Sequence, residues 1–316
     1  MNHRVCLVFA VCAVSAFSGS RVCPQIAPDS PSERTSTELS ELTQKAQTGD
    51  ARSQLLLAQH EMKGLGVERD YKTAAKWYEA AAAQGLAEAQ FELGYLYERG
   101  KGVPQSYQKA LANYRAAAGQ GHATAANNLA VMYDLGEGVH KDLREALTWY
   151  RAAAEHGDPI GQCNLATMYF LGKGVSRDYA LAAKWFRAAA EQNIPAAQNN
   201  LAFFYYTGMG IPLNYAEAAK WTQRSADRGY AQAETGLGYL YEQGKGVPLD
   251  YVAAFMWYSI GARRGDWRAL EKMKSLAPLM KSEQLEEARN RANRWTPQQK
   301  DSPVSLELAS SAPSDH

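Results

Sequence analysis

The sequence has few cysteines, almost no net charge and no apolar segment of bilayer length. Its four cysteines, Cys6, Cys12, Cys23 and Cys163, are too few and too scattered for a disulfide framework. The formal net charge of +1 gives no electrostatic reason to expect a nucleic acid or a membrane surface as partner. No run reaches the roughly 20 apolar residues that span a bilayer. Stability must therefore come from side-chain packing.

The motifs of common enzyme and metal sites are missing as well. The six histidines have no ligand spacing among themselves or with cysteine. No Gly-x-Ser-x-Gly nucleophile elbow is present, and the Gly-x-Gly-Val segments follow no predicted strand, so they are not phosphate loops. We therefore expect no catalytic residue, no metal site and no cofactor. A carboxylate pair assembled from different repeats is left open.

The N-terminus has the layout of a secretory signal peptide. Arg4 supplies a positive charge, residues 5–17 form an apolar run, and small residues follow. We expect residues 1–20 to be removed on export, which predicts a periplasmic or secreted protein with no membrane contact after cleavage. The alternative is an uncleaved signal-anchor.

An internal repeat of 36 residues dominates the rest of the chain. Paired turn glycines recur at this step without an insertion: Gly64/Gly66, Gly100/Gly102, Gly136/Gly138, Gly172/Gly174, Gly208/Gly210 and Gly244/Gly246. A leucine column keeps the same step: Leu57, Leu93, Leu129, Leu165, Leu201 and Leu237. Six such repeats predict an all-α fold, an α/α solenoid in which stacked neighbours bury a continuous core.

Each repeat predicts two helices joined by a turn. The first carries an apolar stripe, such as Ala89, Leu93 and Tyr97, and closes at a glycine that can take a positive φ. The second begins at a side chain that accepts hydrogen bonds from the first helical turn. These caps are Asp70, Ser106, Asp142, Asp178, Asn214 and Asp250. The second helix ends at a glycine, or at Asn193 in the fourth repeat.

The repeats also define the expected domain organisation. Six repeats cover residues 50–265, and capping helices are predicted at residues 37–49 and 266–296. The Pro/Ser-rich segments 21–36 and 297–316 are predicted to be a disordered linker and a disordered tail.

These columns resemble the Sel-one-like repeat (SLR) family, a relative of the tetratricopeptide repeat. The family pattern matches Ala89, Leu93-Gly94, Tyr97, Gly100-Lys101-Gly102-Val103, Asp178, Ala182, Trp185-Phe186 and Ala189-Ala190. The resemblance implies a right-handed superhelix that works as an adaptor or scaffold. Secreted and periplasmic bacterial members of the family look like regulators and host-interaction factors. The chain departs from the pattern at Asn113, in place of tryptophan, and at Thr222, in place of tyrosine or phenylalanine.

Several apolar and amide side chains fall on the side of the first helix opposite its core stripe, where charged residues are the default. At 100° per residue, the columns of Phe91 and Tyr95 point away from that of Leu93. In a solenoid such columns line one surface, which we expect to be the concave one. The candidate partner-binding residues are Phe91, Tyr95, Asn128, Asn164, Phe170, Asn199, Asn200, Phe203, Tyr206 and Tyr239.

Two interpretations of this surface stay open. In one, the asparagines bond a neighbouring helix or turn and the aromatic rings widen the core between repeats. In the other, the ladder of Asn128, Asn164 and Asn200 grips the main chain of an extended peptide, because an amide offers both a donor and an acceptor. The aromatic rings would then hold the side chains of that peptide.

The leading hypothesis is a non-enzymatic scaffold or adaptor that binds a partner protein or an extended peptide in this groove. The second is a cell-envelope enzyme acting on peptidoglycan or a β-lactam, which would need an acid–base pair or a Ser-Lys arrangement in a closed pocket. The third is a purely structural spacer, against which an open aromatic groove would argue. No nucleic-acid partner is expected, and the oligomeric state stays open.

Overall fold

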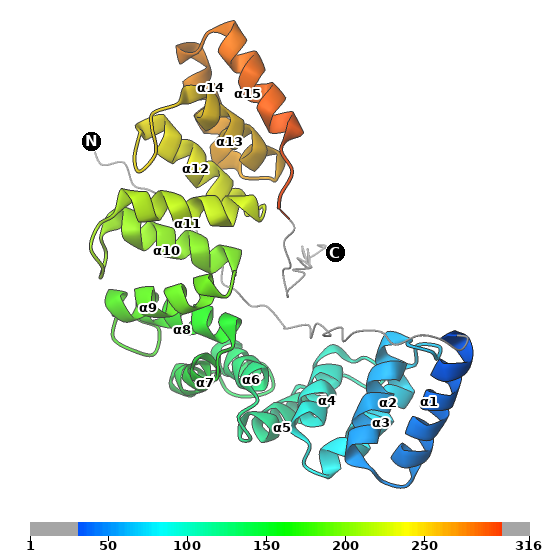
Figure 1. Cartoon of the computed structure of the whole chain (residues 1–316). Coiled ribbons are helices and arrows are strands. Elements are labelled where there is room, and N and C mark those ends of the chain that lie inside the picture. Colours follow the sequence, from blue (N-terminus) through cyan, green and yellow to red (C-terminus); the bar gives the residue numbers. More distant parts are fainter. Residues whose placement is uncertain (1–30, 299–316) are drawn as a thin grey trace, which may run out of the picture. The chain divides into compact units, whose positions relative to one another are not determined.

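The computed structural model describes residues 31–298, which form helices joined by short turns, with no strand in this range (Figure 1). The predicted signal peptide, residues 1–20, and most of the predicted tail lie outside the described residues. The helices are α1 (Pro31–Gln47), α2 (Ala51–Lys63), α3 (Tyr71–Ala83), α4 (Ala87–Arg99), α5 (Tyr107–Ala118), α6 (Ala123–Leu135), α7 (Leu143–Glu155), α8 (Pro159–Leu171), α9 (Tyr179–Glu191), α10 (Pro195–Thr207), α11 (Tyr215–Asp227), α12 (Ala231–Gln243), α13 (Tyr251–Arg263), α14 (Trp267–Leu276), the short 3-10 helix η1 (Ala277–Leu279) and α15 (Ser282–Arg294).

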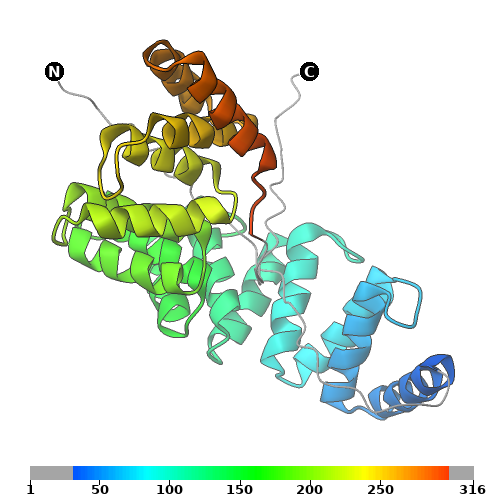
Figure 2. The ribbon, with the colours of Figure 1, turned by 45° about the horizontal axis from the view of Figure 1, so that its top comes forward.

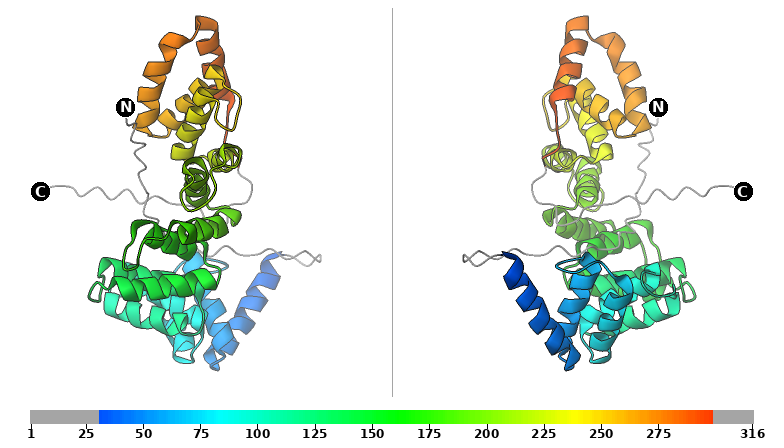
Figure 3. Two further views of the ribbon diagram at one scale, coloured as in Figure 1. Left: turned by 90° about the vertical axis from the view of Figure 1, so that its left-hand side faces the viewer. Right: turned by 90° about the vertical axis from the view of Figure 1, so that its right-hand side faces the viewer.

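The described chain divides into two compact units, an N-terminal unit of residues 31–161 and a C-terminal unit of residues 162–298. The boundary falls inside α8. Within each unit the two helices of a repeat lie side by side, as α2 and α3 do, and the second helix packs on the next repeat, as α3 does on α4 (Figure 1). Figures 2 and 3 show the same pairs from other directions. The predicted all-α fold of paired helices in six 36-residue repeats is confirmed.

The turns have the backbone geometry that their residue types predict. Every second helix begins at the expected cap; Asp250, for example, accepts hydrogen bonds from the backbone N–H groups of Val252 and Ala253 at 2.9 and 3.0 Å. Asn193 takes a φ of 67° where the other repeats have glycine at positive φ. These caps set the helix length independently of the core, which keeps the repeat at a constant step.

The core of each repeat is built on small residues and one large ring. The leucine column is buried throughout, and the alanine columns let the helices approach closely. The deepest ring is not the tryptophan of the repeat but the residue after it; Trp149 is half-buried, whereas its neighbour Tyr150 is buried. These buried rings are Tyr78, Tyr114, Tyr150, Phe186 and Tyr258. In the fifth repeat this position holds Thr222 instead of a ring. Both Thr222 and the preceding Trp221 are buried.

An amide pair links the first helix of several repeats to the turn that follows the second helix. Gln84 donates to Gln54 at 2.9 Å, and Gln120 donates to Gln90 at 2.8 Å, in each case across 30 residues of chain. In the sixth repeat the corresponding pair is an ion pair, with Arg264 Nε 2.9 Å from the carboxylate of the buried Glu234. Burial raises the pKa of Glu234 from 4.5 to about 7, although Arg264 acts in the opposite direction.

Helices close both ends of the repeat array. The first is α1, which begins at Pro31, inside the segment predicted to be a disordered linker, and which packs against α2. At the other end α15 lies on α13 and buries Ala288 and Ala292. The helix α15, Ser282–Arg294, lies within residues 266–296, where capping helices were predicted. Within the described range no helix is long and apolar enough to span a membrane.

Candidate functional site

A groove of about 800 Å³ opens on the C-terminal unit, along the first helices of the last two repeats and the helix that follows them. Side chains from α10, α12 and α14 form its walls, and residues of α11 and α13 form its floor. Its lining residues are Asn199, Ala202, Phe203, Tyr206, Ala218, Thr222, Gln232, Thr235, Gly236, Tyr239, Leu240, Glu242, Gln243, Tyr258, Trp267, Arg268, Glu271, Lys272 and Ser275.

Helical periodicity explains why α10 contributes three side chains to one wall. Asn199, Phe203 and Tyr206 are spaced by four and three residues, so they share one face of the helix. The opposite face carries Leu201 and Phe204, both fully buried. Phe203 is half-buried and meets Phe204 edge-on, with 6.0 Å between the ring centroids. The buried residues of α10 therefore support the residues of the same helix that line the groove.

Hydrogen bonds fix the orientation of two groove tyrosines. Lys245 donates to the Tyr206 hydroxyl at 2.8 Å, and Tyr206 donates to Tyr239 at 3.4 Å. Lys245 also lies over the rings of Tyr206 and Tyr215, at 4.8 and 5.0 Å from their centroids. The bond from Tyr206, with burial as a smaller cause, raises the pKa of Tyr239 to about 12. Both rings are thus held in place before any partner arrives.

The charged side chains around the groove are compensated within the unit. The carboxylate of Glu242 accepts a hydrogen bond from Tyr258 and lies 3.3 Å from Lys272 Nζ. Glu271 pairs with Lys274 at 2.8 Å. In the same way Arg268 pairs with Asp266, whose carboxylate lies 2.9 Å from its guanidinium. The groove therefore presents rings, amides and hydroxyls rather than an uncompensated charge.

The N-terminal unit has a smaller pocket of about 220 Å³ on the corresponding side of its first two repeats. Phe91, Tyr95 and Lys101 line it, together with the buried carboxyl of Glu92. Burial, reinforced by the nearby Glu88, raises the pKa of Glu92 from 4.5 to about 7. The Tyr78 ring, fully buried, forms part of the same wall.

The structure places the ten candidate binding residues in different surroundings. Asn199, Phe203, Tyr206 and Tyr239 line the groove of the C-terminal unit. Tyr95 and Phe91 line the smaller pocket of the N-terminal unit. Asn200 and Phe170 are half-buried and line neither of the two, whereas Asn128 and Asn164 are buried.

The expectation that the Phe91 column points outward is wrong for Phe91 itself, which is 5% exposed. Its ring stacks on His122, with 4.6 Å between centroids, and lies 6.0 Å from the ring of Tyr114. His122 is the residue that caps α6, so a loop residue of the next repeat covers this face of α4. Single-helix periodicity cannot foresee such a cover.

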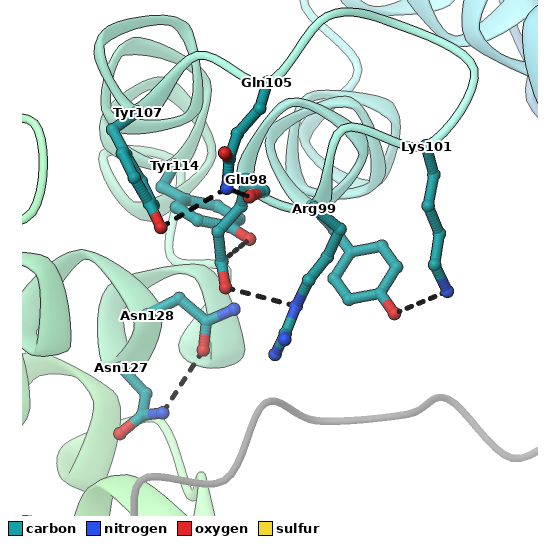
Figure 4. Close-up of polar contacts among 9 residues, drawn as sticks. Glu98, Arg99, Lys101, Gln105, Tyr107, Tyr114, Asn127 and Asn128 are labelled. Atoms are coloured by element: carbon teal, nitrogen blue, oxygen red, sulfur yellow. Dashed lines mark hydrogen bonds and ion pairs between the residues drawn. The ribbon is translucent and has the colours of Figure 1, made fainter. Parts of the chain in front are cut away.

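The asparagine ladder is not an open surface along its whole length. Asn128 and Asn164 are 5% and 6% exposed. Asn128 lies beside the Tyr114 hydroxyl, which donates to Glu98 at 2.6 Å, and Asn127 donates to Asn128 at 3.3 Å (Figure 4). In the N-terminal unit, Asn128 thus matches the interpretation in which asparagine serves the interior of the protein.

Sequence reasoning missed the side of the groove that α14 contributes. Trp267 is 68% exposed, and with Glu271 and Ser275 it forms one helical face. An exposed tryptophan in a capping helix was the available signal, because large exposed rings mark interaction surfaces. Among the described residues no group of His, Cys, Asp or Glu could hold a metal ion.

Paired helices repeated at a constant 36-residue step, with a groove along one row of helices, define an α/α-repeat protein of the tetratricopeptide-like class. The chain belongs to the Sel1 repeat family. The family's pattern matches residues 51–86, 87–122, 123–158, 159–194, 195–230 and 231–266.

Two solved structures are similar to this chain. One is a protective antigen present in uropathogenic Escherichia coli strains, with an SLR fold, 35% sequence identity and a TM-score of 0.74. The match covers 81% of this chain and 56% of that protein, so the chain spans little more than half of its length. The other is a Sel1 repeat protein from Oxalobacter formigenes, at 32% identity and a TM-score of 0.60, covering 74% of this chain and 97% of that one. No curated protein matches the sequence significantly.

Proposed function

We propose that the chain is a non-enzymatic scaffold whose C-terminal groove binds an extended segment of a partner protein. The observation that carries this proposal is the groove of about 800 Å³, in which Asn199, Phe203, Tyr206 and Tyr239 come together from two repeats. A concave, largely apolar site with a few polar groups is the usual form of a binding site. Membership of a repeat family supports the same conclusion, because stacked helices present long surfaces to partners.

The polar side chains of the groove suit a peptide main chain. Asn199, Gln232 and Gln243 each offer an amide donor and an amide acceptor, which match the C=O and N–H of an extended segment. The orientation of Tyr206 and Tyr239 is set by Lys245 in advance, so little conformational entropy is lost on binding. An extended segment is therefore a better fit than a folded surface.

We also propose that the chain acts outside the cytoplasm, in the periplasm or after secretion. The support is the apolar run behind Arg4, with small residues after it. Mass spectrometry of the native protein should find a first residue near position 21 in an extracytoplasmic fraction. A soluble cytoplasmic form that keeps residues 1–20 would contradict export.

Binding can be tested with a phage-displayed library of random peptides and the purified chain. Peptides retained by the wild type should be retained less well by Phe203→Ala and by Tyr239→Ala, with affinities lower by roughly 1–3 kcal/mol for an anchor residue. Tyr95→Ala is the matched control, because it removes an aromatic ring in the same kind of helix in the N-terminal unit. If no peptide is retained, or if Tyr95→Ala weakens binding as much, the proposed groove is wrong.

A further inference from the structure

We propose that the groove contains a socket for one uncharged aromatic side chain of the bound segment, lined by Thr222, Gly236, Ala202, Ala218 and Leu240. This inference rests on the proposed function and specifies the chemistry of the partner. It follows from a comparison of one position in successive repeats.

A ring in the second helix of one repeat faces a polar side chain in the first helix of the next. In the N-terminal unit the Tyr114 hydroxyl lies beside Asn128, 14 residues later (Figure 4). Tyr78 and Glu92 have the same spacing and line the same small pocket. At both junctions a ring and a polar side chain lie between consecutive repeats, and the pocket beside Tyr78 has about 220 Å³.

At the junction of the fifth and sixth repeats both partners are small. The residues at these two positions are Thr222 and Gly236. They still face each other, because a methyl group placed on Gly236 would lie 3.5 Å from the Thr222 methyl carbon. Neither residue carries a ring, and both line the groove of about 800 Å³. The space that a ring occupies in the other repeats is therefore joined to an open binding surface.

The socket is apolar although it contains a threonine. Thr222 donates its hydroxyl to the carbonyl of Ala218 at 2.8 Å, within its own helix, so its methyl group is left to face the groove. Ala202, Ala218 and Leu240 supply the other buried apolar surface. Burying apolar surface of a partner here is favourable, and no polar group of the socket loses a hydrogen bond.

Charge and shape both favour a neutral ring as the occupant. The nearby charges are already paired, Glu242 with Lys272 and Arg268 with Asp266, so a charged side chain would find no free counter-ion. The vacant position is the one that holds Phe186 in the fourth repeat. Tyr239 and Tyr258 line the same groove and can meet a guest ring edge-on, as aromatic pairs prefer.

Side chains of the protein itself should fill the socket when the residues of the fourth repeat are introduced at the matching positions. There Phe186, Ala166 and Asn200 occupy the positions that correspond to Thr222, Ala202 and Gly236. The double variant Thr222→Phe/Gly236→Asn should therefore fold. It should also melt at a higher temperature, because a void is filled and a helix-interior glycine is removed. Aromatic-containing peptides selected on the wild type should bind this variant at least about tenfold more weakly, as expected for loss of an anchor.

A control variant separates this effect from a general change in stability. Asn113→Trp restores the family residue in the N-terminal unit, far in sequence from the groove, and should leave peptide affinity unchanged. Replacing the single aromatic residue of a selected peptide by alanine should lower its affinity for the wild type, but not for the filled variant.

The outcomes distinguish the socket from the proposed function. If the wild type retains no peptide, the proposed function fails. If the wild type retains peptides that lack an aromatic residue, the proposed function stands and the socket is overturned. The same conclusion follows if the filled variant, Thr222→Phe/Gly236→Asn, binds aromatic-containing peptides as tightly as the wild type does. Should the filled variant not fold, methyl NMR of the wild type decides the question. A guest ring shifts the Thr222 methyl resonance upfield by its ring current, and an unshifted resonance in the peptide complex contradicts the socket.

Discussion

At the junction of the second and third repeats Tyr114 is fully buried beside Asn128, whereas at the junction of the fifth and sixth repeats Thr222 faces Gly236. The second helices of the two regions, α5 and α11, begin at the same position of the repeat, each behind a side-chain cap, and have 12 and 13 residues. The pocket beside Tyr78, at the junction of the first and second repeats, has about 220 Å³, and the groove beside Thr222 has about 800 Å³. A repeat can therefore lack one ring and its facing side chain and keep its paired helices, with a larger groove on its surface.

The largest loss of stability is expected when Tyr114, at the junction of the second and third repeats, is replaced by threonine, the residue found at the matching position of the fifth repeat. Tyr114→Thr removes a fully buried ring that donates to Glu98, and no partner segment is available to fill the void. The free energy of unfolding should fall by roughly 3–5 kcal/mol, as for other large aromatic truncations. Urea denaturation of the wild type and the variant measures it. A loss below about 1 kcal/mol would mean that the ring is dispensable in both units.

The second prediction compares the stability lost on truncating a core residue and a groove residue of the same helix, α10. Leu201→Ala should cost about 2–5 kcal/mol of stability, because the side chain is fully buried in α10. Phe203→Ala, two residues later on the groove side, should cost clearly less, because its ring is only half-buried. Thermal denaturation of the two variants gives the comparison. If Phe203→Ala unfolds the protein as readily as Leu201→Ala, its ring belongs to the core.

The third prediction concerns one buried glutamate in each unit, Glu92 and Glu234. The pKa values of Glu92 and Glu234 are both raised by burial, from 4.5 to about 7. A carboxyl with a raised pKa in the folded state opposes folding once it ionises, so stability should fall as the pH rises from about 4.5 to 7. Glu92→Gln should remove up to about 3 kcal/mol of this dependence. Urea denaturation at pH 4.5, 6 and 8 tests it.

Glu234→Gln gives the matched measurement in the C-terminal unit. Its carboxylate has Arg264 as a partner, whereas Glu92 is opposed by Glu88. The glutamine variant of Glu234 should therefore also weaken the contact with Arg264, which reduces its gain at high pH. Equal stability of wild type and Glu92→Gln at every pH would show that the Glu92 carboxyl is not desolvated as described.

The smallest loss of stability is expected on removing a helix N-cap, and it should be the same in both units. Ser106→Ala and Asp250→Ala each remove a side chain that caps a second helix, one in each unit. Each should cost about 1 kcal/mol, which is typical of a helix N-cap. Urea denaturation should detect both losses. A much larger loss at Asp250 than at Ser106 would show that the two regions differ in their backbone framework as well as in their side-chain junctions.

Four residues of the groove could be expected from the sequence because they repeat in register. Asn199, Phe203, Tyr206 and Tyr239 were expected on the face away from the core stripe, and they line the groove. The same rule failed for Phe91, since His122 of a neighbouring turn covers it. Helical periodicity describes one helix at a time, whereas burial depends on what the next repeat places against it.

The sequence by itself determined the helices, their caps and the 36-residue step, because these depend on local hydrogen bonds and on residues such as Asp250 and Asn193 that act on their own turn. It also showed Thr222 as a departure from the repeat. Only the tertiary structure decided that Thr222 meets Gly236 and that both residues line the same groove as Trp267. Those contacts join residues from different repeats, and packing between repeats has no signature in the spacing of a single helix.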